Sequence, residues 1–332
     1  MADAIAPLTT RARAKVNLTL RVLGRRADGY HELCSLVAFA GTGDSLALTP
    51  ARELSLSIAG PQGAGLAVDE RNLVLRAAHA LASETGPLRW GGFHLVKRLP
   101  VASGIGGGSA DAAAALRLLA RLNDLSPDDP RLLRAAARIG ADVPVCLASR
   151  ARVMEGVGDR LGEPLRAPPL FALLVNPGVA VETAAVFREL GLQPGELALA
   201  PSSPHLEEAA LAAVSTDAAA EAGPAGASFA TQAARLAPQD QASRESGLAR
   251  SRLLQRLAES GNDLEDPASR IAPVIATVLA ALRDLPGCRL ARMSGSGATC
   301  FALFDDCRAS AAAGRALQRA RPGWWVKATI LR

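Results

Sequence analysis

Hydrophobic and polar positions alternate with a period of two near the N-terminus. Every second residue from Val16 to Val22 is apolar, whereas Lys15 and Asn17 fall on the opposite face. The pattern predicts a half-buried strand, on which two such residues lie about 6.6 Å apart on one side and can address one ligand together. For Asn17 the competing interpretation is a solvated strand face.

Further alternation predicts a β-rich N-terminal sheet, with apolar runs at 36–39, 46–48 and 54–58. Helices are expected from about Asn72 onward, and helical periodicity covers residues 112–122, 131–139 and 273–285. An apolar strand is predicted at 170–175, followed by a short helix with a threonine cap at Thr183. Two strands flank a glycine turn at 294–298.

Residues 192–250 differ from the rest of the chain. They are rich in Ala, Pro and Ser, with little periodicity and one aromatic residue, Phe229. We interpret them as an insertion that is partly helical or disordered. At 332 residues the chain is long enough for two domains.

A glycine cluster lies between the strand-like run that ends near Leu99 and the helix that follows. Residues 104–108 contain four glycines. A helix N-terminus offers unpaired N–H groups and a partial positive charge, and glycines let the backbone approach an anion closely. We expect a phosphate-binding loop here. The alternative is a tight turn without a ligand.

Three kinds of glycine loop compete for this segment. The nucleotide-triphosphate loop GxxxxGK[ST] requires a lysine after the glycines, and none is present. A dinucleotide loop requires a strand with an acidic end about 20 residues later, where this chain has the end of a helix. Residues 100–110 instead resemble the loop of the GHMP small-molecule kinases: Pro, three variable residues, Gly, an apolar residue, Gly and a run of small residues.

Lysine is scarce in this chain. Lys and Arg together number 37, but only Lys15, Lys97 and Lys327 are lysines. A lysine that remains in so arginine-rich a chain suggests a role that needs a compact point charge, such as contact with a phosphoryl group during its transfer. Two of the three lie in the segments already selected, although chance retention is the alternative.

The remaining composition narrows the class of protein. No apolar run could span a bilayer, and the N-terminus lacks the features of an export signal. Five cysteines without a CxxC pair and four scattered histidines predict a reducing, cytoplasmic location without a zinc site. A net charge of +5 with 3% aromatic residues is not typical of nucleic-acid binding.

Apart from the predicted insertion, nearly the whole chain resembles the GHMP kinase superfamily. The matching segments are AKVNLTLRVLGRRADGYHEL, RLPVASGIGGGSADAAAAL, GADVPVCL, NPGVAVETAAVF, GNDLE and MSGSGATCFALF. The Gly-Tyr-His block and Gly-Ala-Asp-Val-Pro resemble the branch that phosphorylates CDP-methylerythritol in non-mevalonate isoprenoid biosynthesis. The resemblance implies an α+β fold with a ribosomal-S5-like N-terminal domain at residues 1–168 and a ferredoxin-like C-terminal domain at 169–332.

The resemblance also implies ATP and Mg²⁺ as cofactors and assigns residues to the site. Asp142 would accept the proton of the substrate's 2-hydroxyl, with Lys15 as its electrostatic partner. Residues expected to bind the nucleotide are Lys97, Pro100, Val101, Ala102, Ser103, Gly104, Ile105, Gly106, Gly107, Gly108, Ser109 and Ala110. Residues expected to bind the substrate are Asn17, Tyr30, His31, Thr183, Phe187, Gly295, Ser296 and Gly297, with Tyr30 and Phe187 sandwiching the cytosine. Ser109 and Thr183 are expected to help hold Mg²⁺ or the substrate, and the resemblance does not fix the metal ligands.

The expected partner is therefore a small molecule, without nucleic acid or membrane, and the chain is expected to be a monomer or homodimer. Three alternatives stay open: another GHMP kinase of homoserine or mevalonate type, an NAD-dependent oxidoreductase, and an inactive nucleotide sensor. The presence of both Lys15 and Asp142 argues against the last.

Overall fold

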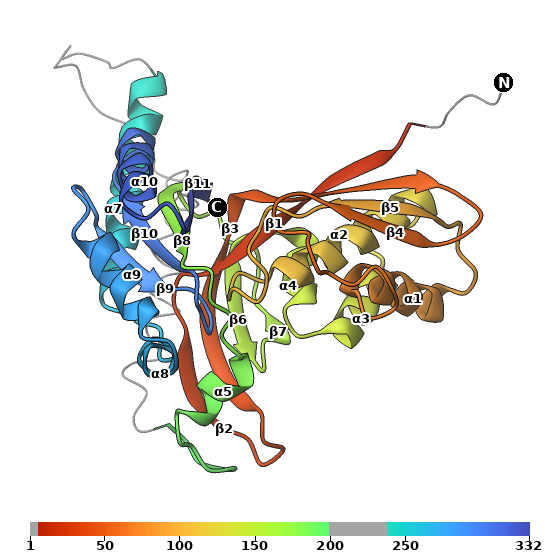
Figure 1. Cartoon of the computed structure of the whole chain (residues 1–332), viewed down its shortest axis with the longest axis horizontal. Coiled ribbons are helices and arrows are strands. Elements are labelled where there is room, and N and C mark those ends of the chain that lie inside the picture. The colour runs from red at the N-terminus through yellow and green to blue at the C-terminus, as the bar shows by residue number, and fades with distance from the viewer. Residues whose placement is uncertain (1–5, 199–237) are drawn as a thin grey trace, which may run out of the picture.

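The computed structural model describes residues 6–198 and 238–332 and shows two lobes (Figure 1). One lobe holds the strands of the N-terminal half and the helices that cover them. Its strands are β1 (Leu8–Asn17), β2 (Arg21–Arg25), β3 (His31–Pro50), β4 (Ser55–Ala59), β5 (Gly91–Val96), β6 (Arg152–Gly156) and β7 (Arg160–Leu161). Its helices are α1 (Leu73–Thr85), α2 (Gly107–Leu122), α3 (Pro130–Ile139) and α4 (Val143–Ala148).

The other lobe is built from the C-terminal half. Its strands are β8 (Leu170–Asn176), β9 (Leu290–Met293), β10 (Cys300–Phe304) and β11 (Trp325–Leu331). Its helices are α5 (Thr183–Arg188), α7 (Pro238–Ala258), α8 (Glu265–Ile271), α9 (Val274–Arg283) and α10 (Cys307–Ala320). None of the helices among residues 6–198 and 238–332 is long and apolar enough to cross a membrane.

Strands of both lobes form one continuous hydrogen-bonded sheet in the order β4-β5-β3-β11-β8-β10-β9. The strands β1, β2 and β6 also pair with β3. The lobes are linked where Leu331 of β11 pairs with Ala40 of β3. Side chains of β3 alternate between two cores. Val37 and Phe39 pack with α1 and α2, whereas Leu36 and Ala38 pack with residues of β8 and α7. β3 therefore belongs to both lobes.

The strand predicted around residues 16–22 is interrupted. β1 ends at Asn17 and β2 begins at Arg21. The prediction of a half-buried strand is wrong at this point, because Lys15 and Asn17 are each only 4% exposed. Loops from both lobes cover their face: the backbone N–H of Lys15 donates to the carbonyl of Ile105, and that of Asn17 donates to Ser294 Oγ.

The predicted helices are present with small shifts. Asn72 caps α1, and α2 begins at Gly107, five residues before the predicted 112. Glu182 rather than Thr183 is the N-cap residue of α5. Of the predicted insertion at 192–250, residues 199–237 lie outside the described residues. Residues 238–250 belong to α7, so this end of the segment is helical, and α7 continues beyond it to Leu253 and Leu257, which are buried in the core.

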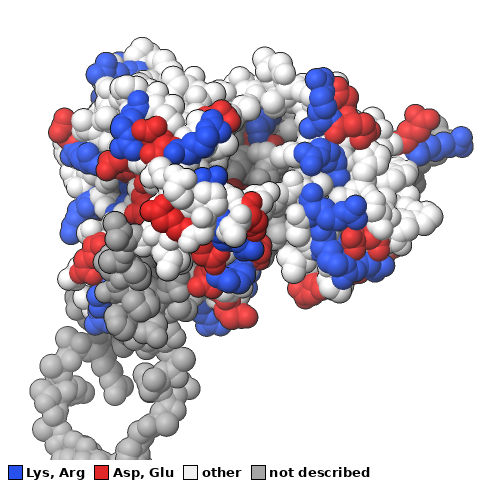
Figure 2. Space-filling model, turned by 90° about the horizontal axis from the view of Figure 1, so that it is seen from below, with Lys and Arg blue, Asp and Glu red and all other residues white. Residues whose placement is uncertain are grey.

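Charged side chains are mixed on the face of the molecule seen in Figure 2, where acidic and basic groups lie next to one another. Exposed side chains of opposite charge form ion pairs, such as Arg71 with Asp69 and Arg89 with Asp124. Exposed pairs of this kind contribute roughly 0–1 kcal/mol each. The buried charges around the pocket are therefore the more informative ones.

Candidate active site

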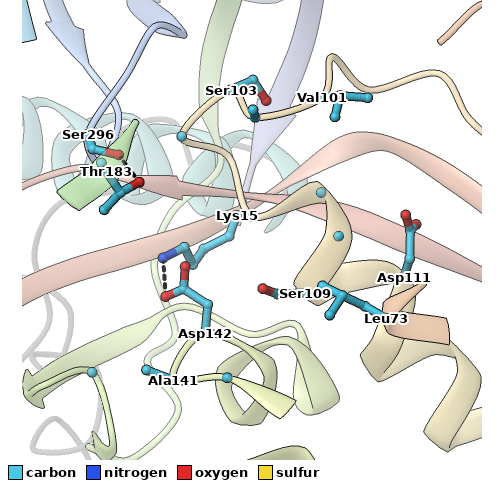
Figure 3. Close-up of a pocket in the computed structure, with 18 of the residues that line it drawn as sticks. Lys15, Leu73, Val101, Ser103, Ser109, Asp111, Ala141, Asp142, Thr183 and Ser296 are labelled. Carbon is cyan, nitrogen blue, oxygen red and sulfur yellow. Dashed lines mark hydrogen bonds and ion pairs between the residues drawn. The ribbon is translucent and has the colours of Figure 1, made fainter. Parts of the chain in front are cut away.

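A pocket of about 860 Å³ lies between the lobes and receives residues from both. The N-terminal lobe contributes the start of α2 and the end of β1, and the C-terminal lobe contributes α5 and the turn at 294–297. Figure 3 shows Lys15, Asp142, Ser109, Thr183 and Ser296 around this space. The volume is within the usual range for a small-molecule site.

The glycine loop opens α2 toward this pocket. Gly106 is the N-cap residue in a left-handed conformation with φ of 61°, and no side chain caps the helix. Gly104 has a φ of 73°, and a Cβ there would lie 2.5 Å from the carbonyl oxygen of Ser294. Glycine is therefore required at Gly104, where the two loops touch. The uncapped first turn, including Gly107 and Ser109, lines the pocket and offers backbone N–H groups to an anion.

Lys15 and Asp142 form an ion pair at this pocket, with 2.6 Å between Nζ and Oδ1. The lysine side chain is 5% exposed and the carboxylate 41% exposed. Lys15 extends from β1, and Asp142 is the N-cap residue of α4, fixed between the end of α3 and Pro144. Residues 127 positions apart thus place one cation and one accessible carboxylate side by side (Figure 3).

The turn at 294–297 closes the C-terminal side of the pocket. The Ser294 hydroxyl accepts from the backbone N–H of Asn17 and donates to the carbonyl of Gly104, at 3.1 Å in each case. Thr183 and Ser296 share a hydrogen bond of 2.8 Å between their hydroxyl oxygens. The turn therefore connects β1, the glycine loop and α5.

The aromatic residues expected around a cytosine are only partly assembled. Phe187 lines the pocket and stacks on His31, with ring centroids 4.7 Å apart. Burial, with a smaller effect of the nearby Arg25 cation, lowers the pKa of His31 below its ordinary 6.5, so the ring is neutral at pH 7. Tyr30 is 66% exposed and is not among the residues that line the pocket. In this structure the stacking partner of Phe187 is thus His31 rather than Tyr30.

Lys97 lies beneath the glycine loop rather than free within the pocket. Its ammonium is 2.7 Å from Asp44 Oδ2 and 2.5 Å from Asp111 Oδ2, and all three side chains are at most 5% exposed. Burial lowers the pKa of Lys97, but the carboxylates of Asp111 and Asp44 more than offset this and raise it overall. Lys97 therefore balances buried carboxylates at the start of α2.

The pocket collects most of the residues that the sequence predicted. Lining it are Lys15, Asn17, Lys97, Pro100, Val101, Ala102, Ser103, Gly104, Gly106, Gly107, Gly108, Ser109, Asp142, Thr183, Phe187, Gly295 and Ser296. Outside its lining are Tyr30, His31, Ile105, Ala110 and Gly297. Ile105 and Ala110 instead pack in the two cores, because their side chains point away from the loop's ligand side.

Several lining residues were not predicted. One group precedes and opens α1, namely Leu66, Ala67, Arg71, Asn72 and Leu73. Its apolar members lie at the same pocket as the apolar Val101. Ser35 and Leu264 also line it. No local motif marks the group at α1 or Ser35. Other lining residues do lie within the matching segments, such as Leu264 in GNDLE, Gly140 and Ala141 in GADVPVCL, and Val181 and Glu182 in NPGVAVETAAVF.

Two family matches follow the same division of the chain. The GHMP kinases N terminal domain matches residues 72–150, which contain α1 to α4 and the glycine loop. The GHMP kinases C terminal domain matches residues 241–322, which contain the turn at 294–297. The fold is thus that of the GHMP kinase class, which confirms the predicted α+β fold class.

Full-length relatives narrow the class. A 4-diphosphocytidyl-2-C-methyl-D-erythritol kinase of Azorhizobium caulinodans is 51% identical over 326 residues, covering 98% of this chain and 99% of the relative. One from Methylobacterium radiotolerans is 52% identical with the same coverage. The chain belongs to the family of 4-diphosphocytidyl-2-C-methyl-D-erythritol kinases. It is therefore an ATP-dependent small-molecule kinase, as predicted.

Solved structures agree with this assignment. A crystal structure of a 4-(cytidine 5'-diphospho)-2C-methyl-D-erythritol kinase is 33% identical, with a TM-score of 0.70 and coverage of 98% of this chain and 99% of that one. A homoserine kinase from Cytophaga hutchinsonii is 19% identical with a TM-score of 0.65 and shares the fold. The alignments cover 98% of this chain and 99% of each of the two curated relatives. These relatives are therefore nearly as long as this chain, whose length includes residues 192–250.

Proposed function

We propose that this chain transfers the γ-phosphoryl group of ATP to the 2-hydroxyl of 4-diphosphocytidyl-2-C-methyl-D-erythritol, in non-mevalonate isoprenoid biosynthesis. The observation that carries the proposal is the Lys15–Asp142 pair, which faces the same pocket as the uncapped start of α2. A polyphosphate bound at the helix start and an alcohol bound at the carboxylate would then be neighbours. The names and full-length similarity of the relatives supply the substrate.

In the proposed mechanism Asp142 accepts the proton of the 2-hydroxyl as its oxygen bonds to the γ-phosphorus. The bond between that phosphorus and the bridging oxygen breaks, and ADP leaves with the electron pair. Lys15 stabilises negative charge on the transferring group and orients the carboxylate through Oδ1. Phosphoryl transfer depends mainly on positioning and charge stabilisation, which a buried lysine and backbone N–H groups provide without reorganisation.

The cytidine end of the substrate would bind toward α5. Phe187 and His31 already form an aromatic wall there, and the neutral His31 ring leaves Nε2 buried without a hydrogen-bond partner. Such an atom suits a polar group of the cytosine ring. Tyr30 is on the adjacent turn before β3 and would complete the predicted sandwich by moving over the base. Base stacking of this kind contributes about 1–3 kcal/mol.

Mg²⁺ would enter with ATP, since this ion usually keeps several waters and binds through substrate phosphates and few protein oxygens. The hydroxyls of Ser109 and Thr183 line the pocket and are the residues we assign to the metal or to the phosphates. Among residues 6–198 and 238–332, no group of three or more His, Cys, Asp or Glu side chains could hold a metal by itself. This fits an ion carried by the nucleotide. The cytoplasmic location and the choice between monomer and homodimer stay predictions.

Acceptor specificity tests the proposal. Purified protein with Mg²⁺ and ATP is assayed for ADP release with CDP-methylerythritol, homoserine or mevalonate as the acceptor. We expect turnover with the first acceptor at least about 100-fold above that with the others, because only it carries a base for the aromatic wall. Product analysis should place the new phosphate on the 2-hydroxyl.

Asp142→Asn provides the control that turnover comes from this site. It should lower kcat by about 10²–10⁴ with little change in the KM for the acceptor. Asp124→Asn, which alters an exposed ion pair with Arg89 outside the pocket, should leave both constants unchanged. Equal turnover with homoserine, or full turnover by Asp142→Asn, would contradict the proposal. Stabilisation by NADH but not by ATP analogues would favour the oxidoreductase alternative.

A further inference from the structure

Ser35 is a buried polar residue within an otherwise apolar part of β3. It is 3% exposed, and it lines the pocket although no sequence motif contains it. Its hydroxyl takes part in two hydrogen bonds. Ser35 Oγ is 2.5 Å from the carbonyl oxygen of Thr19, and Asn17 Nδ2 is 2.8 Å from Ser35 Oγ.

The strand register brings these groups together. Asn17 is paired with Val37 in the antiparallel β1–β3 ladder, and Ser35 lies two residues before Val37 on the same face of β3. Because β1 ends at Asn17 and β2 begins at Arg21, the carbonyl of Thr19 lies in the gap between the strands. It is therefore available to the Ser35 hydroxyl.

The two hydrogen bonds fix the orientation of the Asn17 carboxamide. A hydroxyl has a single hydrogen, and that of Ser35 is donated to the carbonyl oxygen of Thr19. Ser35 can then only accept from Asn17, so the NH₂ group of Asn17 must face Ser35. The reversed carboxamide would place Oδ1 against an oxygen whose hydrogen is already used. Asn17 is thus held in one of its two orientations.

The consequence is an acceptor without a partner. Asn17 Oδ1 is buried and makes no hydrogen bond, and it lies near Gly295 in the turn that closes the pocket. Lys15, two residues earlier on the same face of β1, pairs with Asp142. An unpaired buried acceptor is unfavourable unless a ligand supplies the donor. The acceptor half of the proposed substrate, a polyol, carries hydroxyl donors.

We propose that Ser35 is a positioning residue, which holds Asn17 with Oδ1 directed to a hydroxyl group of the acceptor substrate. The inference rests on the proposed function, because it assigns the polyol part of that substrate to this oxygen. It predicts that Ser35 affects acceptor binding through Asn17 and leaves the nucleotide unaffected.

Steady-state kinetics on a double-mutant cycle test this inference. Ser35→Ala should raise the KM for CDP-methylerythritol about 5–10-fold, with kcat and the KM for ATP within about twofold of wild type. In an Asn17→Ala background the same change should have less than about a twofold effect, because the residue it positions is gone. Ser310→Ala is the matched control, since Ser310 is a 2% exposed serine whose hydroxyl donates to the Cys307 carbonyl on α10, outside the pocket lining.

A second pair of variants guards against poor folding of the alanine variant. Ser35→Thr and Ser35→Val have the same shape and suit a strand, but only Thr keeps the hydroxyl. Thr should retain a KM for the acceptor within about twofold of wild type, and Val should resemble Ala. Equal effects of Thr and Val, or an undiminished effect of Ser35→Ala in the Asn17→Ala background, would overturn the inference.

The two proposals fail in different ways. If wild-type protein turns over homoserine or mevalonate instead of CDP-methylerythritol, the proposed substrate is wrong, and this is visible without any variant. The cycle can then be measured with whichever acceptor the wild type uses. Failure of the cycle with an active wild type overturns only the role of Ser35.

Discussion

Two lysines with carboxylate partners lie within the same lobe, and their surroundings differ. Lys15 pairs with one carboxylate, Asp142, which is 41% exposed. Lys97 contacts two carboxylates, Asp44 and Asp111, and all three groups are buried. In Figure 3 Asp111 lies beyond the start of α2, on the side away from Lys15. The Asp142 carboxylate of the first pair is open to a ligand, whereas the Lys97 cluster is buried and its cation already has two carboxylate partners, although Lys97 and Asp111 border the pocket.

The buried cluster has a structural role. Asp44 Oδ1 accepts from the backbone N–H groups of Arg98 at 2.5 Å and Leu99 at 2.8 Å, immediately before the glycine loop. Lys97 links this carboxylate on β3 to Asp111 on α2. The cluster thus fixes both ends of the loop. The comparison teaches that access to a carboxylate, rather than the presence of a lysine, separates the candidate catalytic pair from a structural one.

Exchanging each lysine for methionine should separate the two roles most clearly. Lys15→Met should lower kcat by about 10²–10³ through loss of charge stabilisation and change the free energy of unfolding by about 1 kcal/mol or less. Lys97→Met should lower the free energy of unfolding by about 3–5 kcal/mol, because it leaves two carboxylates buried without their cation. Denaturant unfolding and ADP-release kinetics measure both.

Lys327→Met is the control for this exchange, because Lys327 lies exposed on β11 and should affect neither measurement. The comparison breaks down if Lys97→Met unfolds at the wild-type denaturant concentration. It also breaks down if Lys15→Met keeps wild-type turnover.

Asp111→Asn should change how stability depends on pH. Burial, partly offset by Lys97, raises the pKa of Asp111 to about 7 from an ordinary 3.8. The folded state therefore binds this proton more tightly than the unfolded state. The stabilisation is complete below about pH 4 and is lost as the pH rises through about 7. An asparagine cannot ionise, so the variant does not lose this stabilisation as the pH rises. The free energy of unfolding of the variant relative to wild type should therefore be about 1–3 kcal/mol higher at pH 8 than at pH 4.

Thermal or urea unfolding of both proteins at pH 4, 6 and 8 measures this difference. Asp124→Asn, an exposed carboxylate, should follow the wild-type pH dependence. Parallel curves for Asp111→Asn and wild type would show that Asp111 is ionised throughout, and the cluster would then carry a net negative charge at all three pH values.

The smallest effects are expected from lysine-to-arginine exchanges. Lys327→Arg should be silent because the side chain is exposed. Lys97→Arg should destabilise by about 1–3 kcal/mol, since the larger guanidinium does not fit where Nζ lies 3.3 Å from the Cβ position of Gly107. Lys15→Arg should keep the fold and lower kcat. An equally silent result at all three positions would mean that lysine was retained by chance.

The local part of this structure could be predicted from the sequence. The strand before the glycine loop, the helix after it and the start of the helices at about Asn72 depend on neighbouring residues, and they are found within a few positions of the prediction. The pairing of Lys15 with Asp142 joins residues 127 positions apart. No local pattern encodes such a contact, and only the family resemblance placed them together.

Burial was the harder property to predict. Lys97 and Lys15 look alike in sequence, and the carboxylates that hold Lys97 come from β3 and α2, 53 and 14 residues away. Ser35 carries no signal beyond a polar residue in an apolar run. Tyr30 and Phe187 were predicted to sandwich a cytosine, but the local turn leaves Tyr30 exposed, so its place over a base depends on a ligand that the sequence does not contain.

The long strand β3 has a consequence for recombining this enzyme with its relatives. Residues 31–50 contact both cores and pair with β1, β5, β6 and β11, so they cannot be assigned to one half alone. A one-residue insertion near Gly41 would exchange the faces of everything beyond it. Chimaeras joined inside this strand should misassemble. Productive crossovers should fall in loops, so that β3 and the strands that pair with it come from the same parent protein.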